Sequence, residues 1–260
     1  MASGIHIATA ETQDEREAVY RFRYRIYVEE MGKYRSVADH KRRMFFEPED
    51  AQSRITYATE DGEVVATARG TWGGDAPLPQ RMIEQYQLAP FLEELPQAAI
   101  SVGERGMVAP HLRGSDLFLR LIGSSLKFAN EKRIQVCFGD CEPHLLNLYL
   151  GLGQRTYAKR NVNSAEGGYL IPILFVPEDV DYLRRIRSPL LEYVRDFGAD
   201  ARIPACVDRI IAAGTSVMSS RLAGSADYWS KVHGALTEIE GARPTALDGL
   251  TDDEAQRCLD

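Results

Sequence analysis

One carboxylate, Glu104, lies inside an otherwise apolar run that includes Ile100, Val102, Met107 and Val108. An ionisable side chain in such surroundings is either a functional group or one half of a structural ion pair. An amine titrates at about pH 8 and needs no more help than one carboxylate, acting directly or through water, to become a nucleophile. We therefore expect Glu104 to be a catalytic base, with the structural ion pair as the alternative.

Arginines and a further acid accompany this carboxylate. Arg69 and Arg105 fall in strand-like runs among apolar or small residues, where a guanidinium either pairs with a carboxylate or clamps an anion through two hydrogen bonds. We expect at least one of them to bind substrate. Arg23, on a predicted helix, and Asp50, after the acidic run that starts at Glu47, are candidates for the same site, and Asp50 would orient Arg23 or the amine. The alternative for both is a solvated surface charge.

The segments that would position these side chains alternate between strand-like and helix-like patterns. Strands are predicted at 5–8, 54–59, 63–72, 99–108, 133–139 and 168–175, and helices at 12–31, 80–95, 116–130 and 143–151. Thr12 and Glu15 form a capping-box pattern at a helix start, and Asp61 and Gly62 between two β-rich runs are typical of a hairpin. This order predicts an α/β (α+β) fold, a mixed twisted sheet with helices on both faces.

The pattern changes after Pro177. Residues 180–197, 204–222 and 226–239 have helical patterns, and no strand is predicted among them. We therefore expect two parts, a mixed domain at 1–176 and a helical C-terminal extension at 177–260. The extension is a candidate interface for a homodimer or another partner.

Composition disfavours several classes of function. The net charge of −7 argues against nucleic-acid binding, and no stretch approaches the roughly 18 consecutive apolar residues of a membrane span. The polar, acidic N-terminal residues do not resemble a signal peptide, so we expect a cytoplasmic protein. The four cysteines form no C-x-x-C pair and the five histidines have no metal-ligand spacing, so we expect no metal site.

Two short motifs, together with the order of elements, resemble the GNAT superfamily of N-acyltransferases. Residues 147–153 (N-L-Y-L-G-L-G) resemble the N-x-Y-x-x-L-G-F ending of the fourth helix of that family. Residues 108–115, with Arg113 and Gly114, resemble its strand-turn-helix, whose backbone N–H groups hold a donor pyrophosphate. The resemblance implies the GNAT fold and acyl transfer from a thioester to an amine.

The resemblance also implies roles for individual residues. Tyr149 matches the position of a general acid for the leaving thiol, with core packing as the alternative. A bulged strand near Met107 and Val108 would offer N–H groups to the tetrahedral intermediate. The donor would therefore contact Met107, Val108, Arg113, Gly114 and Ser115.

A narrower resemblance concerns the first helix. Arg23, Tyr27 and Gly32 fit the pattern R-x-x-x-[FY]-x-x-x-x-G, which resembles the opening of long-chain N-acyl amino acid synthases and N-acyl-homoserine-lactone (autoinducer) synthases. In both groups a charged core binds substrate, and the matching positions here are Arg23, Tyr27, Asp50, Arg69 and Arg105. The autoinducer synthases usually have tryptophan after the glycine and glutamate at the position of Val102, so the amino acid synthases are the better match.

The donor loop departs from the superfamily. Asp116 and Phe118 occupy positions at which small residues usually allow close approach to phosphates. This favours a donor on an acyl carrier protein over acyl-CoA, with no tightly bound cofactor. Residues 16–43 carry nine Lys or Arg against four Asp or Glu, and this basic N-terminal face suits an acidic carrier protein.

We therefore expect an N-acyltransferase that moves a medium or long acyl chain onto the amine of an amino acid or related small molecule. Three alternatives are open: an autoinducer synthase that uses S-adenosylmethionine, an acetyl-CoA-dependent small-molecule acetyltransferase, and an inactive GNAT-like binding module. An exposed Glu104, with no pocket near Arg69 and Arg105, would favour the last.

Overall fold

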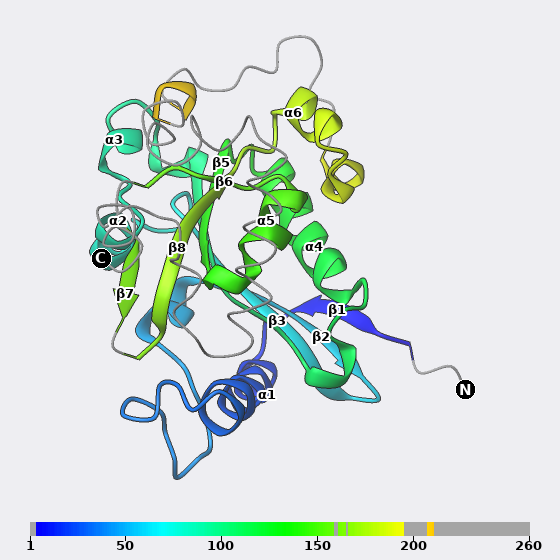
Figure 1. Ribbon diagram of the computed structural model, residues 1–260. Coiled ribbons are helices and arrows are strands. Elements are labelled where there is room, and N and C mark those ends of the chain that lie inside the picture. The colour runs from blue at the N-terminus through cyan, green and yellow to red at the C-terminus, as the bar shows by residue number, and fades with distance from the viewer. Residues whose placement is uncertain (1–3, 159–160, 165, 195–206, 211–260) are drawn as a thin grey trace, which may run out of the picture.

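An eight-stranded sheet forms the centre of the described chain, which in the computed structural model comprises residues 4–158, 161–164, 166–194 and 207–210. The spatial order is β1-β2-β3-β4-β5-β8-β6, and β7 also pairs with β8 (Figure 1). Every pairing is antiparallel except that between β4 and β5. The strands are β1 His6–Thr9, β2 Arg54–Glu60, β3 Glu63–Trp72, β4 Ile100–Val108, β5 Val136–Cys141, β6 Arg155–Thr156, β7 Val162–Ser164 and β8 Gly168–Phe175.

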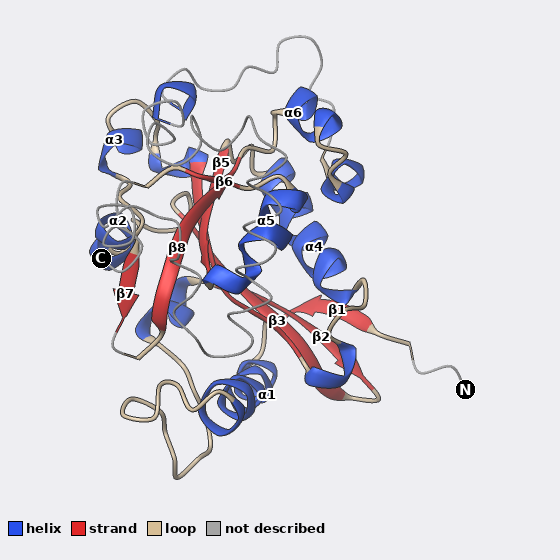
Figure 2. Ribbon diagram, viewed as in Figure 1, coloured by secondary structure: helices blue, strands red, loops and turns tan. Residues whose placement is uncertain are grey.

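Helices surround this sheet (Figure 2). They are α1 Gln13–Arg23, α2 Gln80–Gln85, α3 Ala89–Leu92, α4 Leu117–Glu131, α5 Leu146–Leu152 and α6 Val180–Arg185. A π-helix at Tyr24–Glu30 continues α1. Short 3-10 helices lie at Pro48–Gln52, Gln97–Ala99, Pro110–Leu112, Pro143–Leu145 and Pro189–Tyr193.

Alternate residues of β4 and β5 pack against helices on opposite faces of the sheet. Val102 and Phe138 pack in an apolar cluster with Met82 of α2 and Phe91 of α3. Cys137 points to the opposite face, where it packs against a second cluster built largely from α4, α5 and α6. The mixed sheet with helices on both faces confirms the predicted fold class.

Local sequence signals set the start of α1 and the first hairpin as predicted. The Thr12 side chain accepts a hydrogen bond from the Glu15 N–H, and the Glu15 carboxylate accepts one from the Thr12 N–H, which completes the capping box. Between β2 and β3, Asp61 and Gly62 both have positive φ angles, of 50° and 85°, as a type I′ turn requires. The helical segment ends before Gly32, whose φ of 69° suits glycine.

β4 and β5 separate toward their carboxyl ends. They pair from Ile100 with Val136 through Gly103 with Gly139. Beyond that point β4 continues beside β3 and β5 continues beside β8. We call this region, residues 104–108 of β4 and 140–141 of β5, the β4–β5 splay.

Other details differ from the sequence-based expectation. The helix predicted at 80–95 is interrupted after α2, where Gln87 has a φ of 48°, and resumes as α3. The short strands β6 and β7 were not predicted. The described part of the helix predicted at 180–197 is α6 followed by the 3-10 helix Pro189–Tyr193, and both contribute to the apolar cluster that contains Leu126 of α4.

Most of the predicted C-terminal extension falls outside the described residues. Within it, residues 207–210 are helical, and Val207 is buried in the cluster that contains α2 and α3. The predicted helix at 226–239 lies wholly outside the described chain. No described helix is both long and apolar enough to cross a membrane.

Candidate active site

Arg69 is the centre of a buried cluster of charges. Its side chain is fully buried on β3, and its guanidinium makes ion pairs with Glu104 at 2.6 Å, Glu47 at 2.9 Å and Asp50 at 3.4 Å. Glu104 lies opposite Arg69 in the β3–β4 ladder, and both are therefore fixed by the pairing of the strands. The sequence placed Arg69, Glu104 and Asp50 in one site, and the structure brings them together.

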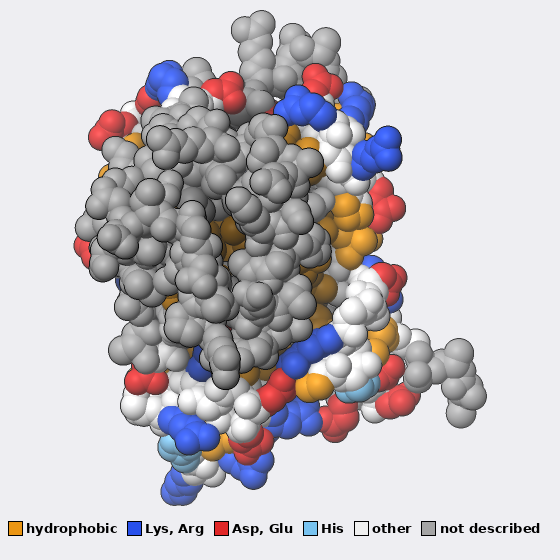
Figure 3. Space-filling model, in the orientation of Figure 1, with side chains coloured by type: hydrophobic (Ala, Val, Ile, Leu, Met, Phe, Trp, Pro, Cys, Tyr) orange, Lys and Arg blue, Asp and Glu red, His pale blue; other side chains and the backbone are white. Residues whose placement is uncertain are grey.

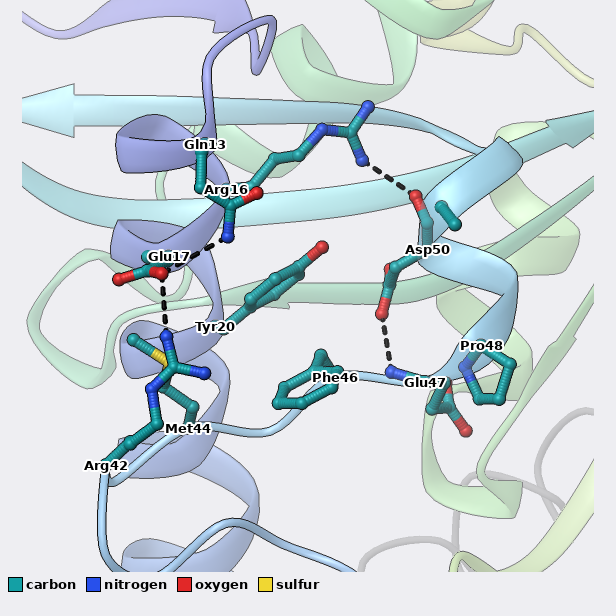
Figure 4. A pocket seen from close by; sticks show the side chains of 11 residues that line it. Gln13, Arg16, Glu17, Tyr20, Arg42, Met44, Phe46, Glu47, Pro48 and Asp50 are labelled. Carbon is teal, nitrogen blue, oxygen red and sulfur yellow. Dashed lines mark hydrogen bonds and ion pairs between the residues drawn. The ribbon is translucent and has the colours of Figure 1, made fainter.

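Arg23 extends the cluster into α1. Its Nη1 donates to Asp50 Oδ1 at 2.7 Å, and both side chains are buried. Asp50 is held in turn by the Glu47 N–H, which donates to Oδ2 at 2.8 Å, and by Arg16, which donates to its backbone carbonyl at 2.7 Å (Figure 4). Asp50 therefore orients Arg23, which is one of the two roles that the sequence suggested for Asp50. Nε and Nη2 of Arg23 are buried and have no hydrogen-bond partner among the described residues.

Arg105 occupies a strained position on β4. Its φ is 58°, and its side chain turns toward the loop after α1, where it binds both carboxylate oxygens of Glu47, at 2.7 and 2.5 Å, and the Tyr34 hydroxyl at 2.7 Å. The rings of Tyr27, Tyr34 and Phe45 surround the guanidinium, with centroids 4.8 to 5.7 Å away. Tyr27, predicted to bind substrate, is thus a wall of the Arg105 pocket.

The arginines keep two of the acids ionised. Burial disfavours a charge on Glu47, but hydrogen bonds from Arg105 and the charges of Arg105 and Arg69 outweigh it and lower its pKa to about 2. The pKa of Glu104 is also lowered, because Arg69, Arg105 and Arg81 outweigh its burial. Glu104 is buried, and its oxygens are already engaged, which makes it a poorer proton acceptor than the sequence suggested.

A β-bulge lies at the start of the splay. Arg69 pairs with Glu104 and Thr67 pairs with Met107, so β4 has one more residue than β3 between these pairs. Arg105 and Gly106 therefore have no partner in the ladder with β3, and β5 no longer pairs with β4 there. The bulge, at Arg105 and Gly106, immediately precedes Met107 and Val108, which are themselves paired with β3 and buried.

Two further residues, which the sequence analysis did not propose, join the site. Tyr86, directly after α2, is fully buried and places its hydroxyl 3.0 Å from Glu104 Oε1 and 2.7 Å from Asp140 Oδ2. Gln85 also donates to Asp140 Oδ2, at 3.3 Å. Asp140 is the first residue of β5 beyond its last pair with β4.

Tyr149 of α5 faces the same region. Its ring packs edge-on against Phe118 with centroids 5.8 Å apart, and its hydroxyl has no hydrogen-bond partner among the described residues. Burial raises the pKa of Tyr149, and nearby Cys141 and Asp140 raise it further. The hydroxyl is therefore protonated at neutral pH and free to donate.

The predicted donor loop lies between β4 and α4. Arg113 donates to the Val108 carbonyl at 3.2 Å and forms an ion pair with Glu30 at 2.7 Å, and Gly114 has a φ of 83°. Ser115 caps the turn by donating to the Leu112 carbonyl at 2.7 Å and accepting from the Leu117 N–H. The N–H groups of Gly114, Asp116 and Phe118 have no backbone partner among the described residues.

The basic N-terminal face is partly neutralised. Arg21 and Arg42 both pair with Glu17, Arg43 pairs with Glu29, and Lys33 pairs with Glu142 at 2.6 Å. Over α1 and the following loop, blue and red side chains are interspersed in Figure 3. Among the described residues Arg35 and Lys41 have no carboxylate partner, and Arg16 and Arg25 donate only to backbone carbonyls, so fewer cations are available than the sequence implied.

A surface pocket of about 550 Å³ adjoins the charge cluster from outside (Figure 4). It lies between α1 and residues 42–51, and Tyr20 and Phe46 form its aromatic wall with ring centroids 5.4 Å apart. Glu47 and Asp50 line this pocket and also bind the buried arginines. Glu104 is buried, whereas an exposed Glu104 would have favoured an inactive binding module, and Arg69 and Arg105 do not themselves line this pocket.

Comparison with solved structures identifies the fold. An N-acyl amino acid synthase from uncultured soil microbes, FeeM, matches with a TM-score of 0.55 at 16% identity, over 75% of this chain and all of that one. The CoA-dependent acyl-homoserine lactone synthase MesI matches with a TM-score of 0.53 at 21% identity, over 78% of this chain and 99% of that one. The acyl-homoserine lactone synthase LasI gives 0.52 at 15%, over 67% and 91%.

The chain has the fold of the GNAT acyltransferases. No protein-family model matches the sequence, and no curated protein does. At these identities the likeness shows the GNAT fold alone, and the activity has to be argued from the site.

The sequence located Arg23, Arg69 and Arg105 but missed Arg81 and several other residues of the site. Glu47 and Asp140 could have been predicted from their positions in the sequence. Glu47 lies three residues before Asp50. Asp140 directly follows one predicted strand, and Glu104 lies on the strand predicted next to it. Tyr34, Arg81 and Tyr86 had none, since a tyrosine or arginine on an amphipathic segment is usually packing or solvated surface.

Proposed function

We propose that this protein is an N-acyltransferase that moves an acyl group from a thioester to the amine of an amino acid or a related small molecule. The observation that carries the proposal is the β4–β5 splay. There an unpaired strand bulge, two carboxylates and a free tyrosine hydroxyl come together beside a buried arginine cluster. Amide formation from a thioester can use an N–H donor for the oxyanion, a carboxylate for the amine proton and an acid for the departing thiolate.

The bulge supplies the place for the thioester carbonyl. Gly106 is exposed and has no ladder partner on β3 or β5, and we propose that its N–H donates to the oxygen that becomes negative in the tetrahedral intermediate. The free hydroxyl of Tyr149 would protonate the departing thiolate. Gly106 lies in the splay, and Tyr149 of α5 packs against Phe118, whose ring adjoins Gly106.

The charge cluster supports a zwitterionic acceptor. We assign the substrate carboxylate to Arg105, because its side chain is partly exposed whereas those of Arg23 and Arg69 are fully buried, and its Nη1 donates to the neutral Tyr34 hydroxyl. Arg69 has carboxylates on several sides and is fully buried, so its role is to fix Glu104, Glu47 and Asp50. Arg23 fixes Asp50 in the same way.

The donor loop supports a thioester whose phosphates are held loosely. The free N–H groups at the start of α4 would attract phosphate, but the exposed Asp116 repels it there. The Phe118 ring lies between Gly106 and Tyr149, where it narrows the space beside the bulge. We therefore propose an acyl carrier protein as the preferred donor and acyl-CoA as the alternative.

Untargeted mass spectrometry of organic extracts tests this function. Extracts of bacteria that express the wild type would be compared with extracts from an empty vector and from Glu104→Gln, after the variant has been shown to be folded. The proposal predicts new N-acyl amino acids that only the wild type produces at full level. N-acyl-homoserine lactones instead would support synthesis of that class, and the absence of any new acyl amide from folded wild type would contradict the proposal.

A further inference from the structure

We propose that Asp140 is the group that takes the proton from the acceptor amine, and that Tyr86 is a positioning residue for it. The proposal rests on the N-acyl transfer proposed above. Neither residue was a candidate from the sequence. Glu104, the expected base, instead stays ionised, and its negative charge favours a proton on Asp140.

The sheet places Asp140 where a base is needed. Gly103 and Gly139 form the last pair between β4 and β5, so Glu104 and Asp140 follow it on the two strands. In a parallel pair, residues at matching positions point to the same face, and both carboxylates indeed reach the hydroxyl of Tyr86. Asp140 therefore faces Glu104 across the gap between β4 and β5, next to the bulge at Gly106.

The Tyr86 hydroxyl has one proton for two carboxylates. Its oxygen is 3.0 Å from Glu104 Oε1 and 2.7 Å from Asp140 Oδ2, and both are hydrogen-bond distances. A phenol donates one hydrogen bond, so with both carboxylates ionised only one of them receives it. When one carboxylate takes a proton, the phenol can turn its own proton toward the carboxylate that stays charged.

The surroundings decide which carboxylate takes the added proton. Glu104 is held as an anion by Arg69 at 2.6 Å and Arg81 at 3.4 Å. Asp140 has no ion pair with an arginine or lysine of the described chain, and its Oδ1 accepts no hydrogen bond there. Asp140 is also partly exposed, whereas Glu104 is buried. The free oxygen of Asp140 is thus the one that an amine can reach.

The titration of Asp140 agrees with this geometry. Burial raises its pKa to about 6, the Tyr86 hydrogen bond offsets part of the rise, and the charge of Glu104 adds to it. A base with such a pKa is ionised at neutral pH and still accepts a proton readily. Ionisable groups face Asp140 from every neighbouring element, and they are Glu104 and Arg105 of β4, Tyr86 after α2, Tyr27 of the π-helix, Tyr149 of α5 and Tyr157 after β6.

The proton balance of the reaction is complete with these groups. The acceptor ammonium gives one proton to Asp140 Oδ1, and the nitrogen lone pair attacks the thioester carbonyl carbon. The C–N bond forms, the intermediate collapses and the C–S bond breaks. The thiolate takes a proton from Tyr149, which regains one from the nitrogen, and Asp140 releases its proton to solvent. The products are an amide, a free thiol and one proton.

The pH dependence of turnover tests the assignment. Purified wild type, Asp140→Asn and Tyr86→Phe would be assayed with decanoyl-CoA, decanoyl-acyl carrier protein and a mixture of amino acids, and Asp75→Asn serves as a control in an exposed turn. The wild type should lose kcat/KM on the acidic side with a midpoint near the pKa of about 6. Asp140→Asn should lose that acidic limb and about 10²- to 10⁴-fold in rate.

Tyr86→Phe separates positioning from structural support. Loss of the phenol removes a hydrogen bond that favours the charged form of Asp140, so the acidic limb should move up by about one pH unit while turnover persists. A role in packing alone would leave the midpoint in place. Asp140→Glu should recover part of the rate with an acidic limb.

Carbon-13 NMR of aspartate carboxyl groups gives a readout that needs no substrate. The proposal predicts one carboxyl with a midpoint near 6 that disappears in Asp140→Asn. A midpoint near the usual value for an aspartate, or an Asp140→Asn variant with wild-type turnover, would overturn the role of Asp140 but not the proposed function. Absence of turnover in wild type with both donors would overturn the proposed function itself, together with the role of Asp140.

Discussion

Replacing Glu47 by glutamine removes a negative charge from between two buried arginines. The carboxylate binds Arg105 through both oxygens and Arg69 at 2.9 Å, whereas an amide keeps only one acceptor and turns its NH₂ toward a guanidinium. Arg69 retains Glu104 and Asp50, but Arg105 is left with the neutral hydroxyl of Tyr34. The variant should therefore be less stable, and the loss should depend on pH.

The magnitude follows from the pKa of Glu47. The structure lowers it from 4.5 to about 2, and each unit corresponds to about 1.4 kcal/mol between the two protonation states. The ion pairs of Glu47 thus contribute roughly 3 kcal/mol at about pH 7. Because the folded pKa is the lower one, this stability is present above about pH 4.5 and is lost as the pH falls toward 2. At about pH 3 roughly 1 kcal/mol remains.

Urea unfolding monitored by tryptophan fluorescence measures this difference. The free energies of unfolding of wild type and Glu47→Gln would be compared at several pH values, and Glu93→Gln, at an exposed glutamate without an ion pair in the described chain, is the control. The gap between wild type and Glu47→Gln should shrink by about 2 kcal/mol between about pH 7 and pH 3. A gap that is constant with pH, or equal to that of the control, would refute the electrostatic account of the cluster.

Three further predictions concern stability. Asp140→Asn should raise the free energy of unfolding by about 1–3 kcal/mol at about pH 8, because the raised pKa of Asp140 means that its charge destabilises the fold above pH 6, and the gain should vanish at about pH 4, as urea titrations at the two pH values would show. Thr12→Ala should cost about 1 kcal/mol through loss of the capping box and leave turnover per folded molecule unchanged, which a melting curve and an assay check together. Gly153→Ala should cost more than about 2 kcal/mol, measured by urea unfolding, because φ is 107° there and an added methyl group meets the Leu183 side chain; a smaller loss would mean that this turn relaxes.

The parts of the fold that the sequence predicted are those with local causes. Thr12 and Glu15 cap their helix through contacts within one turn, and Asp61 and Gly62 can adopt the positive φ angles that the hairpin needs. The break after α2 has no such cause. The apolar pattern continues from Met82 through Tyr86, and the chain bends there while the Tyr86 hydroxyl binds two carboxylates from distant strands. Single-sequence periodicity contains no information about such contacts.

The site was predictable to the extent that strand pairing builds it. Arg69 and Glu104 lie in strand runs, and adjacent strands bring them together. Glu47 was read as part of a solvated acidic run, but the loop after α1 folds back over the sheet and buries it against Arg105. The bulge at Arg105 could not be seen either, because a strand with one extra residue has the same composition as a regular one.

The measurement that most directly tests the central claim is amine-dependent thiol release by the purified protein. A folded wild-type sample would be given decanoyl thioesters of coenzyme A and of an acyl carrier protein, with and without the amino acid mixture, and both thiol and amide would be quantified. Acyl transfer at the splay predicts thiol release that requires the amine, equals the amide formed and falls in Tyr149→Phe, whose ring packing is kept. Thiol release without amide would indicate a thioester hydrolase, and no release from either donor would contradict the proposed function.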